Sequence, residues 1–423
     1  MNGRKRGSLA LAVLLCAALL AGSLELDAAR GAGPVFEVYI DALEQYDLDV
    51  AFNPATGSYL VAWSSTQDSY TQDLWARAVL MDGTLLPAIN LYSTANQKVN
   101  KLSIAADTSR GQFLVVSQLV AGISTNWVQA MLVDWNGSPF GTTLLFSTGA
   151  YWNSGAGPSV VYNPQADEYL IVYEDTNDTN CAVAKVYAYR LDAAGLSILS
   201  SAEVGGCTAN QYSLYARAAY YPGSNQYQVV YINVDTTGGM VYLRTRWLSA
   251  DLSQLGPETV LASSTYMRDF SIINGPDGFL VTYTGKDASN RPQVYSQYLD
   301  SGGNLLGNPI QVTGEQIEQF AWSVPRAAFI GSLGYVVTWD FLASSTLPDS
   351  FDSYYRLLRG HPEPPPSPQM VLADGENHQT GPLVSCAPDM QCLLLFRDDS
   401  SGDYDIYARQ LILQRQSLPL VVK

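Results

Sequence analysis

Histidine is almost absent from this sequence: His361 and His378 are the two that occur among its 423 residues. Nucleophilic triads and most zinc sites use imidazole nitrogens, and neither histidine has the spacing of a metal ligand. The sequence also lacks a Gly-x-Ser-x-Gly elbow, a His-Glu-x-x-His pair and a phosphate-binding glycine loop. These absences argue against the common hydrolase, zinc-enzyme and nucleotide-dependent classes.

Charged residues are also scarce, and positive ones most of all. The chain is 15% charged, with 23 Lys and Arg against 39 Asp and Glu, and its formal net charge is −16. Such a surface repels phosphate backbones and anionic lipids, so we expect neither nucleic-acid nor membrane-surface partners. Cations, neutral sugars and basic peptides remain as candidate ligands. We expect the protein to be a monomer.

One long apolar run occurs, at the N-terminus. Arg4-Lys5-Arg6 precedes the stretch from Leu9 to Gly22, which is short for a membrane span. We interpret residues 1–23 as a signal peptide, followed by a short leader at 24–32; an uncleaved anchor is the alternative. The protein is therefore expected outside the cell or on its surface, without a membrane span after cleavage.

Five cysteines are present, and Cys16 lies inside the apolar leader. An even number remains, which permits disulfides in an exported chain. Cys386 and Cys392 flank a short turn, so they are expected to face each other across a hairpin. Cys181 and Cys207 would form the second pair. Four free buried thiols are the alternative.

The sequence is rich in repeats. An aromatic residue, an apolar run and, in most copies, a second aromatic recur seven times, with starting positions 52 to 58 residues apart. The copies are Tyr59–Trp63, Phe113–Ser117, Tyr169–Tyr173, Tyr227–Tyr231, Phe279–Tyr283, Tyr335–Trp339 and Cys392–Phe396.

Each copy lies within a unit of four expected strands, which we call A to D. In the first unit the expected strands are 48–52, 59–63, 74–80 and 87–92, separated by turn signals such as Asn53-Pro54 and Asp82-Gly83. Seven such units predict an all-β fold, a seven-bladed β-propeller of four-stranded antiparallel blades, as a single domain over 33–416.

The two ends of the chain complement each other. The last unit has strands A (382–385), B (392–396) and C (406–413) but no strand D. Residues 33–40 resemble a D strand, so we expect this N-terminal strand to complete the last blade and close the ring; a disordered leader remnant is the alternative. The short apolar tail, 417–423, would pack on the ring or act as a sorting tag.

The repeat pattern resembles that of exported bacterial β-propeller proteins, many of them uncharacterised. The resemblance rests on Tyr59-Leu60-Val61 with Trp63, an acidic loop, Ile406-Tyr407-Ala408-Arg409 and Asp-Gly turns. More distantly the pattern is similar to WD40-like and Kelch-like propellers. The Trp-Asp endings and His-Asp pairs of true WD40 repeats are absent, so the resemblance implies the fold and no scaffold partners.

Acidic residues gather in the expected B–C loops. The densest group is Asp398, Asp399, Asp403 and Asp405. Aspartates in loops ordinarily bond their own backbone, and on that interpretation no cofactor is expected. The alternative is calcium, which takes several oxygen ligands, although this spacing does not match an EF-hand.

The expected D–A loops carry aromatic and amide side chains on the same face. A ring of such groups at a channel mouth suits stacking on a sugar and hydrogen bonding to its hydroxyls; packing between blades is the alternative. The candidate ligand-binding residues are Tyr46, Trp152, Tyr212, Tyr266, Arg268, Trp322 and His378.

These patterns favour a secreted, non-catalytic binding or interaction module. Its glycan or protein ligand would dock on the face formed by the B–C and D–A loops. The alternative is a glycoside hydrolase or lyase that uses carboxylates at the channel mouth, for which Glu44, Glu315 and Glu318 are candidates.

Overall fold

The computed structural model describes residues 32–413, with gaps. The gaps are 68–70, 94, 96, 122–124, 149–156, 176–183, 195, 266, 268, 315–324, 343–350, 360–368 and 374–376. The expected signal peptide, nearly all of the leader and the tail lie outside the described residues.

Antiparallel sheets make up the described chain, and four of them are consecutive four-stranded meanders. They are β10 (Ser159–Asn163), β11 (Glu168–Asp175), β12 (Lys185–Asp192) and β13 (Ile198–Gly205); β14 (Gln211–Tyr221), β15 (Gln226–Asp235), β16 (Met240–Ser249) and β17 (Thr259–Ser264); β18 (Phe270–Asn274), β19 (Gly278–Lys286), β20 (Pro292–Asp300) and β21 (Leu305–Gln311); and β22 (Arg326–Phe329), β23 (Tyr335–Leu342), β24 (Phe351–Leu358) and β25 (Met370–Ala373). A short 3-10 helix, η2 (Gly331–Leu333), lies between β22 and β23.

Two further meanders share an eight-stranded sheet. They are β2 (Gln45–Asn53), β3 (Ser58–Thr66), β4 (Gln72–Leu80) and β5 (Ile89–Tyr92), then β6 (Gln97–Asp107), β7 (Gln112–Ala121), β8 (Thr125–Val133) and β9 (Pro139–Thr148). A single parallel pair, Gln72 with Lys98, joins them.

The last sheet combines the two ends of the described chain, in the order β1 (Ala32–Tyr39), β28 (Asp405–Ile412), β27 (Gln391–Asp398) and β26 (Gln379–Cys386). Strand β1 runs antiparallel to β28 and pairs Phe36 with Ala408.

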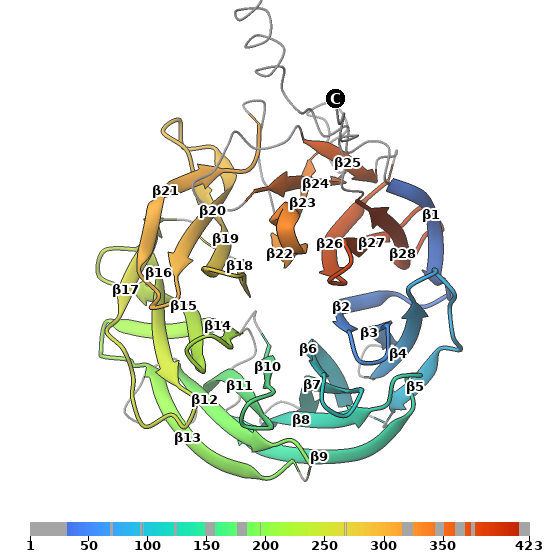
Figure 1. Ribbon diagram of the computed structural model, residues 1–423, viewed down its shortest axis with the longest axis horizontal. Helices are drawn as coiled ribbons and strands as arrows, with labels where there is room; N and C mark the ends of the chain where they lie inside the picture. The colour runs from blue at the N-terminus through green and yellow to red at the C-terminus, as the bar shows by residue number, and fades with distance from the viewer. Residues whose placement is uncertain are drawn as a thin grey trace, which may run out of the picture.

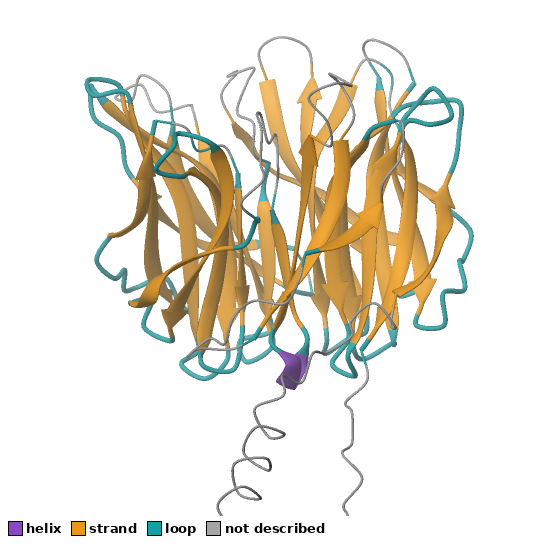
Figure 2. Ribbon diagram, turned by 90° about the horizontal axis from the view of Figure 1, so that it is seen from above, coloured by secondary structure: helices purple, strands orange, loops and turns teal. Residues whose placement is uncertain are grey.

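The sheets are arranged around a central axis, which is the architecture of a β-propeller. Figure 1 shows β2, β6, β10, β14, β18, β22 and β26 nearest the axis; we call these the inner strands. Figure 2 shows the strands running between two loop-bearing faces, with η2 at one of them.

The seven apolar runs predicted as strands all form strands, and each is the second of its meander. In β3, for example, each residue from Tyr59 to Trp63 is at most 2% exposed. Neighbouring sheets cover both faces of these strands, which explains why the runs are continuously apolar rather than alternating.

A repeated aromatic contact joins four of the inner strands to the second strand of their sheet. Phe52 and Tyr59 have ring centroids 4.8 Å apart, and the Tyr162–Tyr169 pair repeats this contact at 5.2 Å. Tyr220–Tyr227 and Phe329–Tyr335 repeat it at 5.4 and 5.3 Å. Tilted rings at these separations add to the stabilisation from burial alone.

The first and last sheets share a hydrophobic core. Val38 of β1, Trp63 of β3 and Leu393 of β27 are all 0% exposed and belong to one cluster. The Tyr59 hydroxyl donates to the Gln391 carbonyl at 3.1 Å, which adds a polar link between the same two sheets.

The predicted Cys386–Cys392 disulfide is confirmed, between the paired strands β26 and β27. The other predicted pair includes Cys181, which lies outside the described residues. Over the ranges given above, no helix is long and apolar enough to cross a membrane.

Candidate functional site

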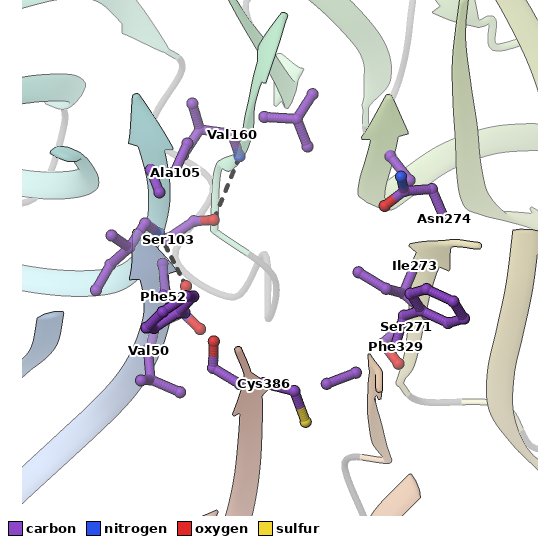
Figure 3. A pocket seen from close by; sticks show the side chains of 18 of the residues that line it. Val50, Phe52, Ser103, Ala105, Val160, Ser271, Ile273, Asn274, Phe329 and Cys386 are labelled. Atoms are coloured by element: carbon purple, nitrogen blue, oxygen red, sulfur yellow. Dashed lines mark hydrogen bonds between the residues drawn. The ribbon is translucent and has the colours of Figure 1, made fainter. Parts of the chain in front are cut away.

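A central cavity of about 720 Å³ runs along the axis and is lined by residues of all the inner strands. Its wall is mostly apolar, with Val50, Ala105, Val160 and Ile273 among the side chains shown in Figure 3. It extends to the turns between the inner and second strands, where Pro54 and Pro388 line it. The described cavity is therefore bordered by the A–B turns, at the opposite end of the inner strands from the D–A loops.

One level of this cavity is polar. Each inner strand pairs with the second strand of its sheet, which carries the apolar run. The inner-strand residue opposite the fourth residue of that run lines the cavity in every case. We call these residues the polar ring: Asp49, Ser103, Ser159, Arg217, Ser271 and Arg326, with Leu383 as the one apolar member. A register shift comes directly before this position in β14 and β26 and one residue earlier in β2 and β6, and such bulges re-aim the side chains that follow.

Three members of the polar ring bind the next inner strand. Asp49 Oδ2 accepts the N–H of Ile104 at 2.8 Å, and Ser103 Oγ accepts the N–H of Val160 at 3.3 Å (Figure 3). Ser159 Oγ accepts the N–H of Ala218 at 3.3 Å. These bonds satisfy inward-pointing backbone donors, which are costly to leave unpaired inside a protein.

The two arginines of the polar ring are held mainly by backbone oxygens. Arg217 Nη1 donates to the carbonyls of Gly157 and Ala216 at 3.3 and 3.2 Å. Arg326 Nη1 donates to the Pro325 carbonyl at 3.2 Å and lies 3.5 Å from Asp269 Oδ1.

Burial perturbs the charged groups of the ring. The strands around Arg217 desolvate it and lower its pKa, an effect that the negative charge of Asp269 opposes. Burial raises the pKa of Asp49, although its carboxylate keeps some solvent contact in the cavity; the N–H groups of Ile104 and Val50, and then the two arginines, partly offset that rise.

A second polar group lies on the face formed by the B–C and D–A loops. We call it the rim cluster: Phe351, His378, Arg397, Asp399 and Tyr404. The His378 ring lies edge-on to Phe351, with centroids 5.6 Å apart, and its Nδ1 is 3.1 Å from the Tyr404 hydroxyl. The Arg397 guanidinium lies over the Tyr404 ring at 5.1 Å.

Backbone bonds fix this cluster in place. The N–H of His378 donates to Asp399 Oδ1 at 2.8 Å, and the N–H of Asp399 donates back to the His378 carbonyl at 3.3 Å. The side chains of His378 and Asp399 are each 28% exposed. His378 and Asp399 are therefore joined through backbone bonds and are partly open to solvent.

The predicted ligand-binding residues are only partly brought together. Tyr46 lies next to the rim cluster: the N–H of its neighbour Gln45 donates to the Tyr404 carbonyl at 3.1 Å, and the Tyr46 hydroxyl donates to Glu44. Tyr212 lies on a different sheet, in β14. Trp152, Tyr266, Arg268 and Trp322 lie outside the described residues, as do Glu315 and Glu318.

Three of the four aspartates proposed as calcium ligands accept hydrogen bonds through their carboxylates. Asp398 Oδ1 accepts the N–H of Ser400 at 2.7 Å, and Asp399 binds His378 as described above. Asp405 accepts from Ser401 Oγ at 2.6 Å and from the Asp41 N–H at 3.3 Å. Among the residues that the structure describes, no group of three acidic, histidine or cysteine side chains is arranged to hold a metal ion, and this includes Asp403.

Sequence reasoning missed the polar ring. Its residues carry no motif, and they lie in separate repeats. The signal is visible only when the copies are aligned on their apolar runs, which places Asp49, Ser103, Ser159 and Arg217 at one position.

No family model and no curated protein matches the chain. Solved structures do resemble it. A protein of unknown function from Dyadobacter fermentans aligns with a TM-score of 0.50 and 10% identity, over 90% of this chain and 99% of that one. The β-propeller domain of the Trilobed protease from Pyrococcus furiosus aligns at 0.48 and 11%, over 90% and 98%. The Hadza microbial sialidase Hz136 aligns at 0.47 and 12%, over 88% and 66%. The arrangement of the sheets around a central axis, described above, is what assigns the chain to the β-propeller fold.

Proposed function

We propose that this chain is a non-catalytic binding module of the cell exterior that docks a glycan or protein ligand on the face formed by the B–C and D–A loops. The rim cluster is the observation that carries this proposal. It presents two aromatic rings, an imidazole and a guanidinium, fixed by backbone bonds and open to solvent. Ordered aromatic and polar groups of this kind bind ligands at little entropic cost.

The chemistry of the rim cluster suits a polar ligand with apolar patches. Aromatic faces stack on such patches, while His378, Asp399 and Tyr404 offer hydrogen-bond donors and acceptors. The Cys386–Cys392 disulfide lies at the other end of the same sheet and is compatible with an oxidising, extracellular location.

The test is binding of the purified mature chain to a glycan array and to a panel of extracellular proteins. The Phe351→Ala and His378→Ala variants should each lose binding to the strongest hit by about tenfold or more. The matched control is Trp135→Ala, because Trp135 is 46% exposed on the turn between β8 and β9, on the opposite face, and should bind normally. Binding that survives both rim variants, or a chain that binds nothing in either panel, would refute the proposal.

A hydrolytic alternative is favoured by one observation. Asp49 combines burial in the central cavity with a raised pKa, and these are properties of a general acid. Its bond to Ile104 argues for a structural role instead, because Ser103 and Ser159 make the same bond without being able to act as acids. Release of reducing sugar by the wild type and its loss in Asp49→Asn would favour the hydrolase.

The same proposal assumes a closed ring of seven blades, in which β1 completes the last one. It is supported by the pairing of β1 with β28 and by the core shared between the first and last sheets. The bond from Gln410 Nε2 to the Met81 carbonyl at 3.0 Å supports it further.

A further inference from the structure

On one side of the cavity, side chains of the polar ring accept the inward-pointing backbone N–H groups of the next inner strand. Three inner-strand residues lie opposite the third residue of the apolar run in their sheet: Ile104, Val160 and Ala218. The N–H of each is accepted by a polar-ring side chain of the preceding inner strand. Ile272, Ala327 and Val384 occupy the same register position in the following three sheets. By this equivalence their N–H groups also point into the cavity.

Two of the three side chains in the accepting position are arginines. Arg217 precedes Ile272 and Arg326 precedes Val384, and a guanidinium has no acceptor. Ser271 precedes Ala327, and its hydroxyl lies 2.6 Å from Thr282 Oγ1 on the paired strand. This half of the polar ring therefore presents two guanidiniums and three backbone N–H groups, together with the hydroxyl of Ser271.

One of the two arginines in this half lacks a close carboxylate partner. Asp269 lies within 4 Å of Arg326, but among the described residues no carboxylate comes that close to Arg217. At longer range the negative charges of Asp269, Asp49 and Glu174 stabilise the half-buried Arg217, while Arg326 repels it. The Nη1 of Arg217 is therefore bonded by backbone carbonyls rather than by a carboxylate.

We propose that this half-ring, Arg217 and Arg326 with the N–H groups of Ile272, Ala327 and Val384, binds the carboxylate group of a small organic acid. Two planar guanidiniums and nearby N–H groups match the two oxygens of a carboxylate. A cavity of about 720 Å³ admits the rest of such a molecule, and its apolar wall suits a body with few polar groups. This site lies in the cavity and goes beyond the proposed function, which concerns the rim cluster.

Calorimetry on the mature chain tests the proposal with two matched pairs of probes, benzoate against benzamide and glucuronate against methyl glucoside. The site should bind benzoate, glucuronate or both. The acid that binds shows whether the cavity accepts an aromatic ring or a sugar ring beside the carboxylate. The neutral partner should bind at least about tenfold more weakly, because it loses a charge-assisted pair. No carboxylate binding up to about 10 mM, or equal binding of the neutral partners, would overturn the proposal.

Three variants locate the site. Arg217→Gln should weaken binding by about 10- to 100-fold, and Arg291→Gln, at a surface arginine paired with Asp287, should leave it unchanged. Asp49→Asn keeps an acceptor for Ile104 and removes a negative charge, so it should tighten binding severalfold. Unaltered affinity in Arg217→Gln, or weaker binding in Asp49→Asn, would contradict the assignment.

Two measurements keep the test independent of folding and of the rim. The wild-type melting temperature should rise with benzoate or glucuronate concentration and not with the neutral partner, and its failure to rise counts against the site. The rim variant Phe351→Ala should bind the carboxylate normally, so loss of the proposed function and loss of this site are distinguishable.

Discussion

The N-terminal strand offers a sharp test of how the ends of the chain hold together. Val38 of β1 is 0% exposed in the core shared by the first and last sheets, while Val35 on the same strand is 40% exposed. Val38→Ala removes two buried methyl groups at about 0.8 kcal/mol each. With the cavity that remains, the free energy of unfolding should fall by about 2–3 kcal/mol.

The matched control is Val35→Ala, which removes the same atoms from a solvent-facing position. It should change the free energy of unfolding by less than about 0.5 kcal/mol. Urea unfolding followed by tryptophan fluorescence measures both variants, and deletion of 32–39 should be more severe than either. Equal stability of the two alanine variants would refute the placement of β1 against the last sheet.

Three other predictions test the disulfide, the cavity and the contacts between sheets. Cys386→Ser should lower the free energy of unfolding by about 2 kcal/mol, and treatment with reductant should lower the wild-type stability by a similar amount; identical melting with and without reductant would contradict this. Because the pKa of Asp49 is raised in the folded chain, the folded chain binds a proton at a higher pH than the unfolded chain does. The stability of the wild type relative to Asp49→Asn should therefore fall as the pH rises from about 3.8 through the folded pKa. A difference in urea midpoint that is constant between pH 3.5 and 7.5 would count against this prediction. Asn163→Ala should lower the free energy of unfolding by about 2–4 kcal/mol, because Asn163 is fully buried and its amide donates to Asn225 and Tyr227 at 3.1 Å. The surface variant Gln165→Ala should lower it by less than about 1 kcal/mol. Similar losses in both variants would show that the buried bonds contribute little.

The strands were predictable because their signals are local. An apolar run covered on both faces, ended by a turn such as Asn53-Pro54, specifies a strand without reference to the rest of the chain. The bounds of some strands differ from the sequence pattern because backbone hydrogen bonding decides where a strand begins. In the fourth unit, residues 256–261 have the sequence pattern of a strand D, but β17 forms at Thr259–Ser264. Pro257 has no N–H to donate, and the N–H of Gly256 bonds the Trp247 carbonyl outside the regular ladder.

The candidate sites were less predictable because they depend on contacts between distant residues. His378 was selected from its loop, but its partners Phe351, Tyr404 and Arg397 were not, since their contact depends on how the loops of neighbouring sheets meet. The polar ring depends on strand register and on bulges, and a one-residue shift would move Arg217 out of it. Asp398, a candidate metal ligand from the sequence, accepts the N–H of Ser400, which is the local backbone bonding that aspartates in loops ordinarily make.

Hydrogen–deuterium exchange with the strongest array ligand tests most directly where this propeller binds. The proposal predicts slower exchange at residues 377–380 and 399–404, around the rim cluster, on addition of ligand. It predicts no change at residues 134–138, the turn on the opposite face that carries Trp135. Protection of that turn with none at the rim cluster would contradict the account.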